Sequence, residues 1–379
     1  MNEDSKKRIE NLRFKKDSLS KLGASFHPAD MKHFQEQLKC RNLASSTRII
    51  PELFPEIGKM IEEVRRRIIP EYTVEAYVRN SSDAQACCFP GSGKSISIAL
   101  TSGLIQLFSI EELCFVVGHE LGHFLLEHHK YPQAEDAAGQ AEKLNLLALS
   151  RSAEISADRV GFVATIKKES ALKAVLKLAT GLPDQFLRFD VSAYLDQARE
   201  LHKMGGSEYD LLSTHPVCTT RMRALLWFEM SELYNEWRGI KGSAPISSSA
   251  LDSRVEKDMS AASGFRLTAI NKKEADSALL WGALSLFVAD GRLSKDEQVL
   301  MTQTFGEKVS AAAFQVLKEH GPDKVLENFE TALQSVKFMD SEIKETLYRD
   351  LDRFSGLAGG EPAVRDQLLK KAQTRLFLN

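Results

Sequence analysis

Residues His119-Glu120-Leu121-Gly122-His123 form the pattern HExxH directly after a largely apolar run. Residues four apart on an α-helix lie on one face about a turn from each other, so His119 and His123 could bind one Zn²⁺ together. Glu120, next to the first histidine, could then polarise a bound water. No other segment of the sequence indicates a chemistry so directly.

A third ligand is needed, because catalytic zinc usually takes three protein ligands and leaves one position for water. Downstream, Glu154 and Asp158 are again four residues apart, so one helical face presents two carboxylates. The economical assignment makes Glu154 the third ligand of one Zn²⁺ per chain. Asp158 would stand behind it and accept a hydrogen bond from an imidazole N–H.

His129 is the competing third ligand, because its distance from His119 fits the spacing HExxHxxGxxH. That motif needs a chain-bending Gly where this sequence has Leu126. On an unbroken helix, ten residues at about 100° each carry His129 well off the face of His119. Glu154 is therefore favoured, and we expect His128 and His129 in the last helical turn, where a cation suits the helix dipole.

The segment Ser213-Thr214-His215-Pro216 could belong to the same site. A His-Pro pair at the start of a helix is usually only a turn. Near a zinc hydrolase, however, His215 could donate a hydrogen bond to a developing oxyanion.

These motifs carry a resemblance. HExxH, then ExxxD (Glu154 and Asp158), then THP with Arg221 five residues after the proline, resemble the M48 peptidases. These are the HtpX-like and CAAX prenyl protease-like zinc metalloendopeptidases, and the resemblance covers about residues 50 to 238. It implies a zincin-like (gluzincin) domain. Those relatives carry membrane helices and this sequence has none, so it is more similar to the soluble, stand-alone members.

The resemblance also implies a role for each of seven residues. Three would bind zinc, two would act in catalysis and two would support the others: His119, His123 and Glu154; Glu120 as general base with His215; and Asp158 with Arg221. The hairpin that ends near Leu100 would supply the edge strand that pairs with an extended substrate.

The elements that position these residues are mostly helices. Apolar spacing predicts a helix over 51–69, and β-rich alternation predicts short strands over 72–78, 85–89 and 95–100. The last two strands flank Pro90-Gly91-Ser92-Gly93, which is typical of a hairpin.

Two helices must carry the motifs themselves. Ser109 is a plausible N-cap with Glu112 closing a capping box, and its helix is expected to run through HExxH to about His129. A second helix over roughly 146–166 carries Glu154 and Asp158.

Residues Gly91-Ser92-Gly93-Lys94-Ser95 resemble the end of a P-loop. The full pattern needs Gly where Cys88 stands and a helix after Ser95. Because Ser95-Ile96-Ser97-Ile98 alternates like a strand, the hairpin is the preferred interpretation.

Length and composition limit the number of domains and the classes of protein that are possible. The 379 residues suffice for two domains of about 150 residues each. Apolar content of 43% and charged content of 27% are ordinary for a soluble globular protein. The net charge of −2 gives no electrostatic reason to expect nucleic acid as a partner. No stretch approaches the roughly 18 uncharged apolar residues of a transmembrane helix, and the charged amino terminus is no signal peptide.

The cysteines indicate the compartment. They are odd in number and scattered, and they form no CxxC pair: Cys40, Cys87, Cys88, Cys114 and Cys218. They make no disulfide framework. Reduced thiols and a cytoplasmic location are the resulting prediction.

The predicted fold is mainly α with a small β-sheet. Residues 1–50 are highly charged and should form a solvated N-terminal helical arm, and 51–238 form the peptidase domain. Residues 239–264 are small and polar, which is typical of an interdomain linker. Residues 265–379 are helix-periodic and should form an all-α bundle.

One segment of the bundle resembles the helical TerB-like module: Phe287-Val288-Ala289-Asp290-Gly291-Arg292-Leu293-Ser294-Lys295-Asp296-Glu297. That resemblance implies an interaction domain, and hence a protein partner, more than a second active site. The same segment matches part of the pattern of a calcium-binding loop but lacks Asp or Asn ligands at alternate positions. A Gly-marked turn followed by a Ser294 N-cap, with Glu297 closing a capping box, is the preferred interpretation.

The sequence thus predicts a zinc-dependent metalloendopeptidase that hydrolyses peptides or proteins with a zinc-activated water and Glu120 as base. Two alternatives stay open. One is a non-catalytic, chaperone-like binding protein with structural or vestigial zinc, and the other is a latent peptidase regulated by its helical domains.

Overall fold

The structure is a computed structural model. It describes a set of segments that together cover most of the chain: residues 3–17, 41–91, 93–137, 139–205, 208–262, 266–337, 339–359 and 362–377. The described residues fall into two units. The first draws on segments within 1–131 and 149–264, and the second on segments within 132–148 and 265–379.

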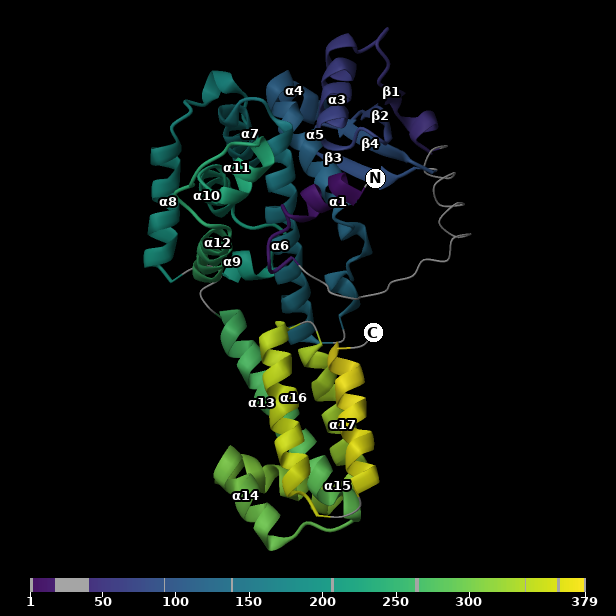
Figure 1. The fold of residues 1–379 in the computed structure, drawn as a ribbon, viewed down its shortest axis with the longest axis vertical. Helices are drawn as coiled ribbons and strands as arrows, with labels where there is room; N and C mark the ends of the chain where they lie inside the picture. The colour runs from purple at the N-terminus through teal and green to yellow at the C-terminus, as the bar shows by residue number, and fades with distance from the viewer. Residues whose placement is uncertain are drawn as a thin grey trace. The chain divides into compact units, whose positions relative to one another are not determined.

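A four-stranded sheet in the first unit has the order β1-β2-β4-β3 (Figure 1). Its strands are β1 (Thr47–Arg48), β2 (Thr73–Arg79), β3 (Ala86–Pro90) and β4 (Ser95–Thr101). Strand β2 pairs in parallel with β4, and β3 pairs antiparallel with β4, with Cys88 opposite Ile98. The three predicted strands and the hairpin are confirmed, and Ser95 begins a strand rather than the helix of a P-loop. Strand β3 is left as the edge strand of the hairpin.

Helices cover the sheet because β4 buries its apolar side chains, with Ile96, Ile98 and Leu100 fully shielded. Helix α3 (Pro55–Ile68) packs on α5 (Ile110–Leu125), and α5 also packs on β3 (Figure 1). The short helix α4 (Ser102–Leu107) joins β4 to α5.

The capping box at the start of α5 is confirmed. Ser109 Oγ accepts a hydrogen bond from the Glu112 backbone N–H, and Glu112 accepts one from the Ser109 backbone N–H.

The end of α5 corrects one prediction. The helix stops at Leu125 instead of continuing to about His129. Glu127 adopts a left-handed conformation with φ of 59°, which no helix can continue through. His128 and His129 therefore lie in a separate 3₁₀ turn, η1 (His128–Lys130), and not in the last turn of α5.

The remaining helices of the first unit surround this core. They are the later part of α6 (Gln140–Ala164), then α7 (Lys168–Thr180), α8 (Val191–Lys203), α9 (Glu208–Leu212), α10 (Cys218–Glu229), α11 (Glu232–Arg238) and α12 (Ser248–Ala262). The short 3₁₀ turn η3 (Asp184–Phe186) lies between α7 and α8, whereas the turn η2 (Ala134–Asp136) belongs to the second unit. Helix α10 ends at Glu229, and Ser231 caps the start of α11.

Two segments expected to be solvated or extended contribute to the core. Part of the segment 239–264, predicted as a linker, folds as α12 and buries Leu251 and Val255. In the N-terminal segment, α1 (Glu3–Glu10) leads into a stretch that buries Ile9, Leu12 and Phe14. The burial of these apolar residues was not predicted because charged residues surround them in the sequence. The domain boundaries stay predictions.

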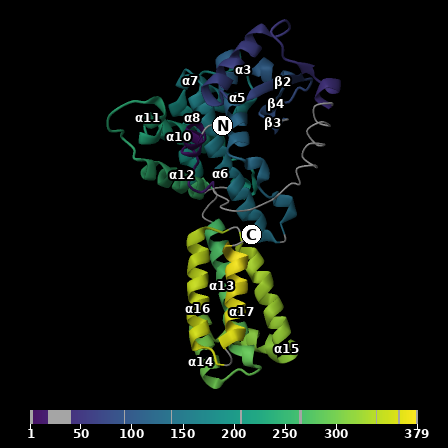
Figure 2. The ribbon, with the colours of Figure 1, turned by 45° about the vertical axis from the view of Figure 1, so that its right-hand side comes forward.

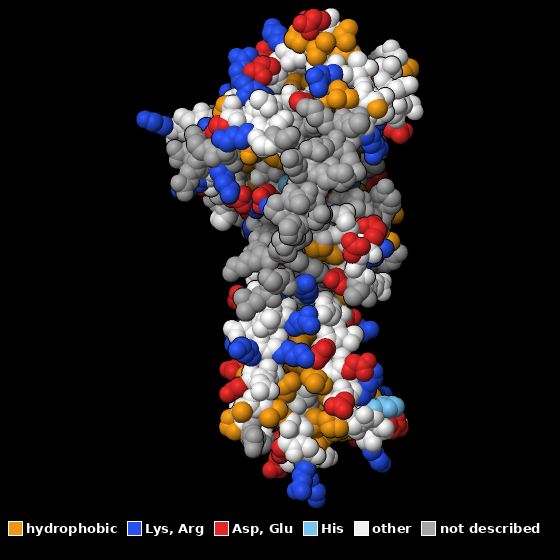
Figure 3. All heavy atoms as spheres, turned by 90° about the vertical axis from the view of Figure 1, so that its right-hand side faces the viewer, with side chains coloured by type: hydrophobic (Ala, Val, Ile, Leu, Met, Phe, Trp, Pro, Cys, Tyr) orange, Lys and Arg blue, Asp and Glu red, His pale blue; other side chains and the backbone are white. Residues whose placement is uncertain are grey.

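The second unit is all-α, as predicted. Its helices after residue 265 are α13 (Arg266–Phe287), α14 (Lys295–Phe305), α15 (Glu307–Val336), α16 (Ser341–Leu357) and α17 (Pro362–Phe377), with the turn η4 (Val288–Asp290) after α13. Figure 2 shows α13, α15, α16 and α17 side by side around a core that includes Phe287, Phe329 and Leu351. On the face shown in Figure 3, Lys and Arg side chains of this unit are interspersed with Asp and Glu.

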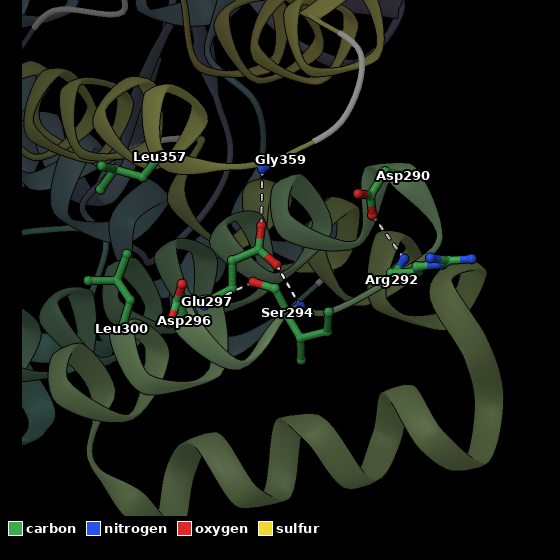
Figure 4. A pocket seen from close by; sticks show the side chains of 9 residues that line it. Asp290, Arg292, Ser294, Asp296, Glu297, Leu300, Leu357 and Gly359 are labelled. Atoms are coloured by element: carbon green, nitrogen blue, oxygen red, sulfur yellow. Dashed lines mark hydrogen bonds between the residues drawn. The ribbon is translucent and has the colours of Figure 1, made fainter.

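The predicted turn and capping box at Ser294 are confirmed in the second unit. A pocket of about 650 Å³ lies there, and Figure 4 shows its lining side chains. Glu297 accepts hydrogen bonds from the backbone N–H of Ser294 at 2.8 Å and of Gly359 at 3.1 Å. Asp290 accepts one from the backbone N–H of Arg292 at 2.9 Å. These carboxylates thus stabilise turns and a helix start.

Among the described residues, no helix combines the length and the apolar character needed to cross a bilayer. Cys87, Cys88, Cys114 and Cys218 are free thiols. Cys40 lies outside the described residues.

Candidate metal centre

Helix α5 presents His119 and His123 on one face. Their Nε2 atoms lie 3.0 Å apart, and the two rings meet edge to face. His119 is buried and His123 is half-buried. The four-residue spacing read from the sequence therefore produces two imidazole nitrogens that converge on one point.

Helix α6 brings Glu154 to the same point. Its Oε1 lies 3.2 Å from His123 Nε2, and its Oε2 lies 3.4 Å from His119 Nε2. Ligand atoms of the three residues all lie within 4.8 Å of one another. Glu154 Oε2 is fully buried yet accepts no hydrogen bond from the described residues. Two imidazoles and an unsatisfied carboxylate oxygen in this spacing fit a divalent cation such as zinc.

Small residues let the two helices approach closely enough for this arrangement. A Cβ on Gly118 would lie 2.3 Å from Ala164 Cβ, and one on Gly122 would lie 3.0 Å from Ala157 Cα. A Cβ on Gly161 would in turn lie 2.8 Å from the Phe115 carbonyl oxygen. The backbones of α5 and α6 thus touch where larger side chains would separate His119 from Glu154.

Asp158 lies one turn further along α6 and is fully buried. Its Oδ1 accepts a hydrogen bond from His119 Nδ1 at 2.9 Å. Arg221 on α10 donates to both carboxylate oxygens, from Nε to Oδ2 at 2.8 Å and from Nη2 to Oδ1 at 2.6 Å. Because Asp158 holds a proton on Nδ1, Nε2 is the nitrogen of His119 that faces Glu154 and could bind a metal.

The charges in the cluster are strongly coupled. Burial lowers the pKa of His119, but the carboxylates of Glu154 and Asp158 outweigh it and raise the pKa to about 10. Burial likewise raises the pKa of Glu154, but His123 and His119 hold it well below its ordinary value. Burial also raises the pKa of Asp158, but the charges and hydrogen bonds of Arg221 and His119 together lower it. Both carboxylates therefore stay ionised, as a cation site requires.

His215 lies at the rim of the cluster, just before α10. Its Nε2 is 3.4 Å from Glu154 Oε1, and its side chain is 60% exposed. Thr214 Oγ1 lies 2.8 Å from His215 Nδ1, and Ser213 Oγ accepts a hydrogen bond from the His215 backbone N–H. The buried Arg151 donates to the Ser213 carbonyl and fixes this loop against α6. His215 is thus exposed to solvent and still within reach of the cluster.

Glu120 is half-buried on α5, the helix that packs against edge strand β3. Burial raises the pKa of the Cys87 and Cys88 thiols on β3, and the Glu120 carboxylate raises them further. The Glu120 carboxylate therefore lies close enough to edge strand β3 to affect its thiols.

His129 does not join the cluster. It is exposed in the turn η1, where its ring stacks on Phe124 with 6.0 Å between centroids. The turn after α5 directs it away from His119, so Glu154 alone of the two competing ligands reaches both histidines.

The structure adds residues that the sequence did not indicate. His128 is buried, and its Nδ1 lies 2.8 Å from His123 Nδ1. Its Nε2 lies 2.9 Å from Oδ2 of the fully buried Asp17. Tyr131 donates to Asp17 Oδ1 at 2.6 Å, and Arg13 lies 3.3 Å from Asp17 Oδ2. No motif links residues 13–17 to HExxH, and the buried apolar positions Leu12 and Phe14 are the only signal in the sequence.

Comparison with known proteins agrees with this geometry. The model of peptidase family M48 matches residues 51–141 and 133–228. A plastoglobule-localized, chloroplastic metallopeptidase 48 of Arabidopsis thaliana is 29% identical over 147 residues, which cover 35% of this chain and 43% of the relative. The chain therefore spans less than half the length of that relative. No solved structure matches the chain significantly. The match to peptidase family M48 thus covers residues 51–228, which contain the candidate metal centre.

Proposed function

We propose that the protein is a zinc-dependent metalloendopeptidase. The match of residues 51–228 to peptidase family M48 supports a hydrolase that acts on peptide bonds. The observation that carries the finer proposal is the convergence of His119, His123 and Glu154 within 4.8 Å, with Glu120 on the same helix as the histidines.

His119, His123 and Glu154 would hold one zinc ion. When bound, zinc supplies Lewis acidity, which lowers the pKa of water towards about 7 and polarises a peptide carbonyl. Asp158 and Arg221 keep the first imidazole in the tautomer whose Nε2 can bind a metal. The exposed side of the cluster, where His215 lies, leaves access for substrate.

Glu120 would act as general base and then as general acid. It takes a proton from the attacking water as the water oxygen bonds to the carbonyl carbon. Glu120 then returns that proton to the amide nitrogen as the C–N bond breaks, which releases an amine and a carboxylic acid, and the acid ionises in water. A carboxylate beside the first zinc-binding histidine is suited to both transfers.

His215 would stabilise the negative charge that develops on the carbonyl oxygen. It is exposed at the rim of the cluster, 3.4 Å from Glu154, so its Nε2 can donate to an oxygen of the substrate. Ser213 and Thr214 restrain its backbone and ring.

The substrate would be an extended segment of a peptide or protein. Among the described strands, β3 pairs only with β4, so an added strand could pair with its other side. Strand β3 packs on α5, the helix that carries His119 and Glu120. A peptide paired with β3 would therefore run past the metal cluster.

Glu120→Gln tests the proposal. The variant should keep one zinc per chain and lose cleavage of a peptide library, because the amide cannot accept the proton. Glu111→Gln, an exposed position on the same helix, is the matched control and should retain full activity. Cleavage that persists in Glu120→Gln would overturn the mechanism. A wild-type protein that binds zinc but cleaves no peptide would instead favour a non-catalytic, chaperone-like protein.

Location and partners are separate proposals. The free thiols suit a reducing compartment, and a cytoplasmic location stays a prediction. The name of the Arabidopsis relative places that protein at plastoglobules. A protein partner for the second unit, and its TerB-like character, also stay predictions.

A further inference from the structure

A chain of hydrogen bonds leads from His123 away from the metal centre into the N-terminal segment. His123 Nδ1 and His128 Nδ1 are 2.8 Å apart, and His128 Nε2 is 2.9 Å from Asp17 Oδ2. Asp17 is fully buried and His128 is 8% exposed. Two imidazoles and a carboxylate therefore form a continuous buried series that ends at a candidate zinc ligand.

The chemistry of the last member sets the direction of every proton in the series. An ionised carboxylate can only accept, so Asp17 takes the proton of His128 Nε2–H. The neutral His128 then has a bare Nδ1, which accepts from His123 Nδ1–H. This arrangement leaves a lone pair on His123 Nε2, the atom that faces His119 and Glu154.

Several contacts fix Asp17 in place. Tyr131 donates to its Oδ1, Arg13 lies against its Oδ2, and Ser156 also hydrogen-bonds its carboxylate. Ser156 lies on α6 between Glu154 and Asp158, and its Oγ accepts a hydrogen bond from the Phe14 backbone N–H at 2.9 Å. The N-terminal segment is thus fixed to the helix that carries the candidate third ligand.

Further contacts hold the same segment against α6 and α12. The buried Arg159 of α6 donates to the Leu12 carbonyl and lies over the Phe14 ring. Asp252 of α12 accepts hydrogen bonds from Arg159 and from the Lys15 backbone N–H. The segment around Asp17 is therefore anchored by contacts that are independent of His128.

We propose that His128 and Asp17 are positioning residues for His123, and that the N-terminal segment thereby completes the metal centre. This inference rests on the proposed zinc site. The two candidate histidine ligands are then held in the same way, because each donates its Nδ1–H into a buried system that ends in a carboxylate. His119 reaches Asp158 directly, and His123 reaches Asp17 through His128.

The proposal adds a requirement that the family match does not contain. Asp17 lies outside residues 51–228, the part of the chain that matches family M48. His128 lies inside that range but outside the HExxH and ExxxD motifs. The second histidine of HExxH would therefore depend on a segment more than a hundred residues earlier in the chain.

The test compares variants of the full chain by zinc affinity, measured in competition with a chelating dye, and by the visible spectrum of the Co²⁺-loaded protein. His128→Leu and Asp17→Asn should each bind zinc about 10–100-fold more weakly than wild type. His128→Asn should bind zinc more tightly than His128→Leu, because its amide oxygen lies about where His128 Nδ1 lies in wild type and can accept the same hydrogen bond. Lys15→Gln, which removes a surface ion pair with Glu256 from the same segment, should bind zinc like wild type.

The outcomes separate this inference from the proposed function. A wild-type protein that binds no zinc would refute the zinc site itself. A wild-type protein that binds zinc, together with a folded His128→Leu or Asp17→Asn variant of equal affinity and unchanged Co²⁺ spectrum, would overturn the positioning role. Circular dichroism of the metal-free proteins identifies folded variants, and Asp17→Asn preserves side-chain volume in case His128→Leu does not fold. Equal losses in His128→Leu and His128→Asn would also contradict the proposal, because only a hydrogen-bonding role distinguishes them.

Discussion

Replacing Gly118 by alanine tests whether the close approach of α5 and α6 forms the metal centre. The added Cβ would lie 2.3 Å from Ala164 Cβ and 3.0 Å from Gly161 Cα. Carbon atoms in contact normally lie about 3.5–4.0 Å apart, so the helices would have to separate by roughly 1.2 Å or more. His119 follows Gly118 directly, and Glu154 lies on the opposing helix, so this separation should disrupt the cluster.

The expected magnitude combines two opposing effects. Overpacking typically costs about 1–3 kcal/mol, and replacing a helical glycine by alanine recovers roughly 0.5–1 kcal/mol. A net loss of about 1–2 kcal/mol should lower the Tm by roughly 2–8 °C for a unit of this size. Displacement of a catalytic group by about 1 Å can cost on the order of 100-fold in rate, so kcat/KM should fall far more than stability does.

Thermal unfolding, zinc affinity and peptide cleavage together check this prediction. Gly356→Ala is the matched control, since it also lies in a helix and no other atom lies within 4 Å of its added Cβ. The control should keep its activity and keep or slightly raise its Tm, because the alanine favours the helix. If Gly118→Ala matches wild type in zinc affinity and cleavage, the spacing of the two helices does not set the site.

Three further predictions follow from the same contacts. Asp158→Asn should weaken zinc binding about 10–100-fold in the dye competition assay and destabilise the fold by about 3–5 kcal/mol, because Arg221 loses its buried partner; the exposed Asp196→Asn should do neither. Chelation should abolish cleavage and lower the Tm, and zinc at a thousand times its Kd should restore about 4 kcal/mol of stability, as calorimetry would show. Burial raises the pKa of Asp17, but the hydrogen bond and charge of His128, together with hydrogen bonds from Ser156 and Tyr131, hold it below its ordinary value. The metal-free wild type should therefore have a larger free energy of unfolding than Asp17→Asn above about pH 4, and this difference should disappear as the pH falls through the folded pKa of Asp17. Chemical denaturation at several pH values measures the difference, and a difference that grows as the pH falls would contradict the prediction.

Local patterns in the sequence predicted much of the fold, because each depends on neighbours in the chain. The capping box at Ser109, the β3–β4 hairpin and the helical second unit all follow from residues a few positions apart. The end of α5 could not be predicted in this way. Glu127 carries the left-handed conformation that stops the helix, and glutamate gives no sign of it.

For the candidate site, too, the features set by local spacing could be predicted and those set by tertiary packing could not. Spacing of four residues placed His119 with His123 and Glu154 with Asp158, since helical geometry alone fixes those pairs. The buried connection to Asp17 depends on tertiary packing of a charged segment whose apolar anchors are few. Helix α12 was not predicted either, because the small and polar residues that precede it are typical of a linker.

The central claim is that His119, His123 and Glu154 hold one divalent cation between α5 and α6. Zinc content per chain, measured by elemental analysis of wild type beside Glu154→Ala and His129→Ala, tests it most directly. We expect one zinc in wild type and in His129→Ala, and a large loss in Glu154→Ala. Zinc that is retained without Glu154 and lost without His129 would contradict the account.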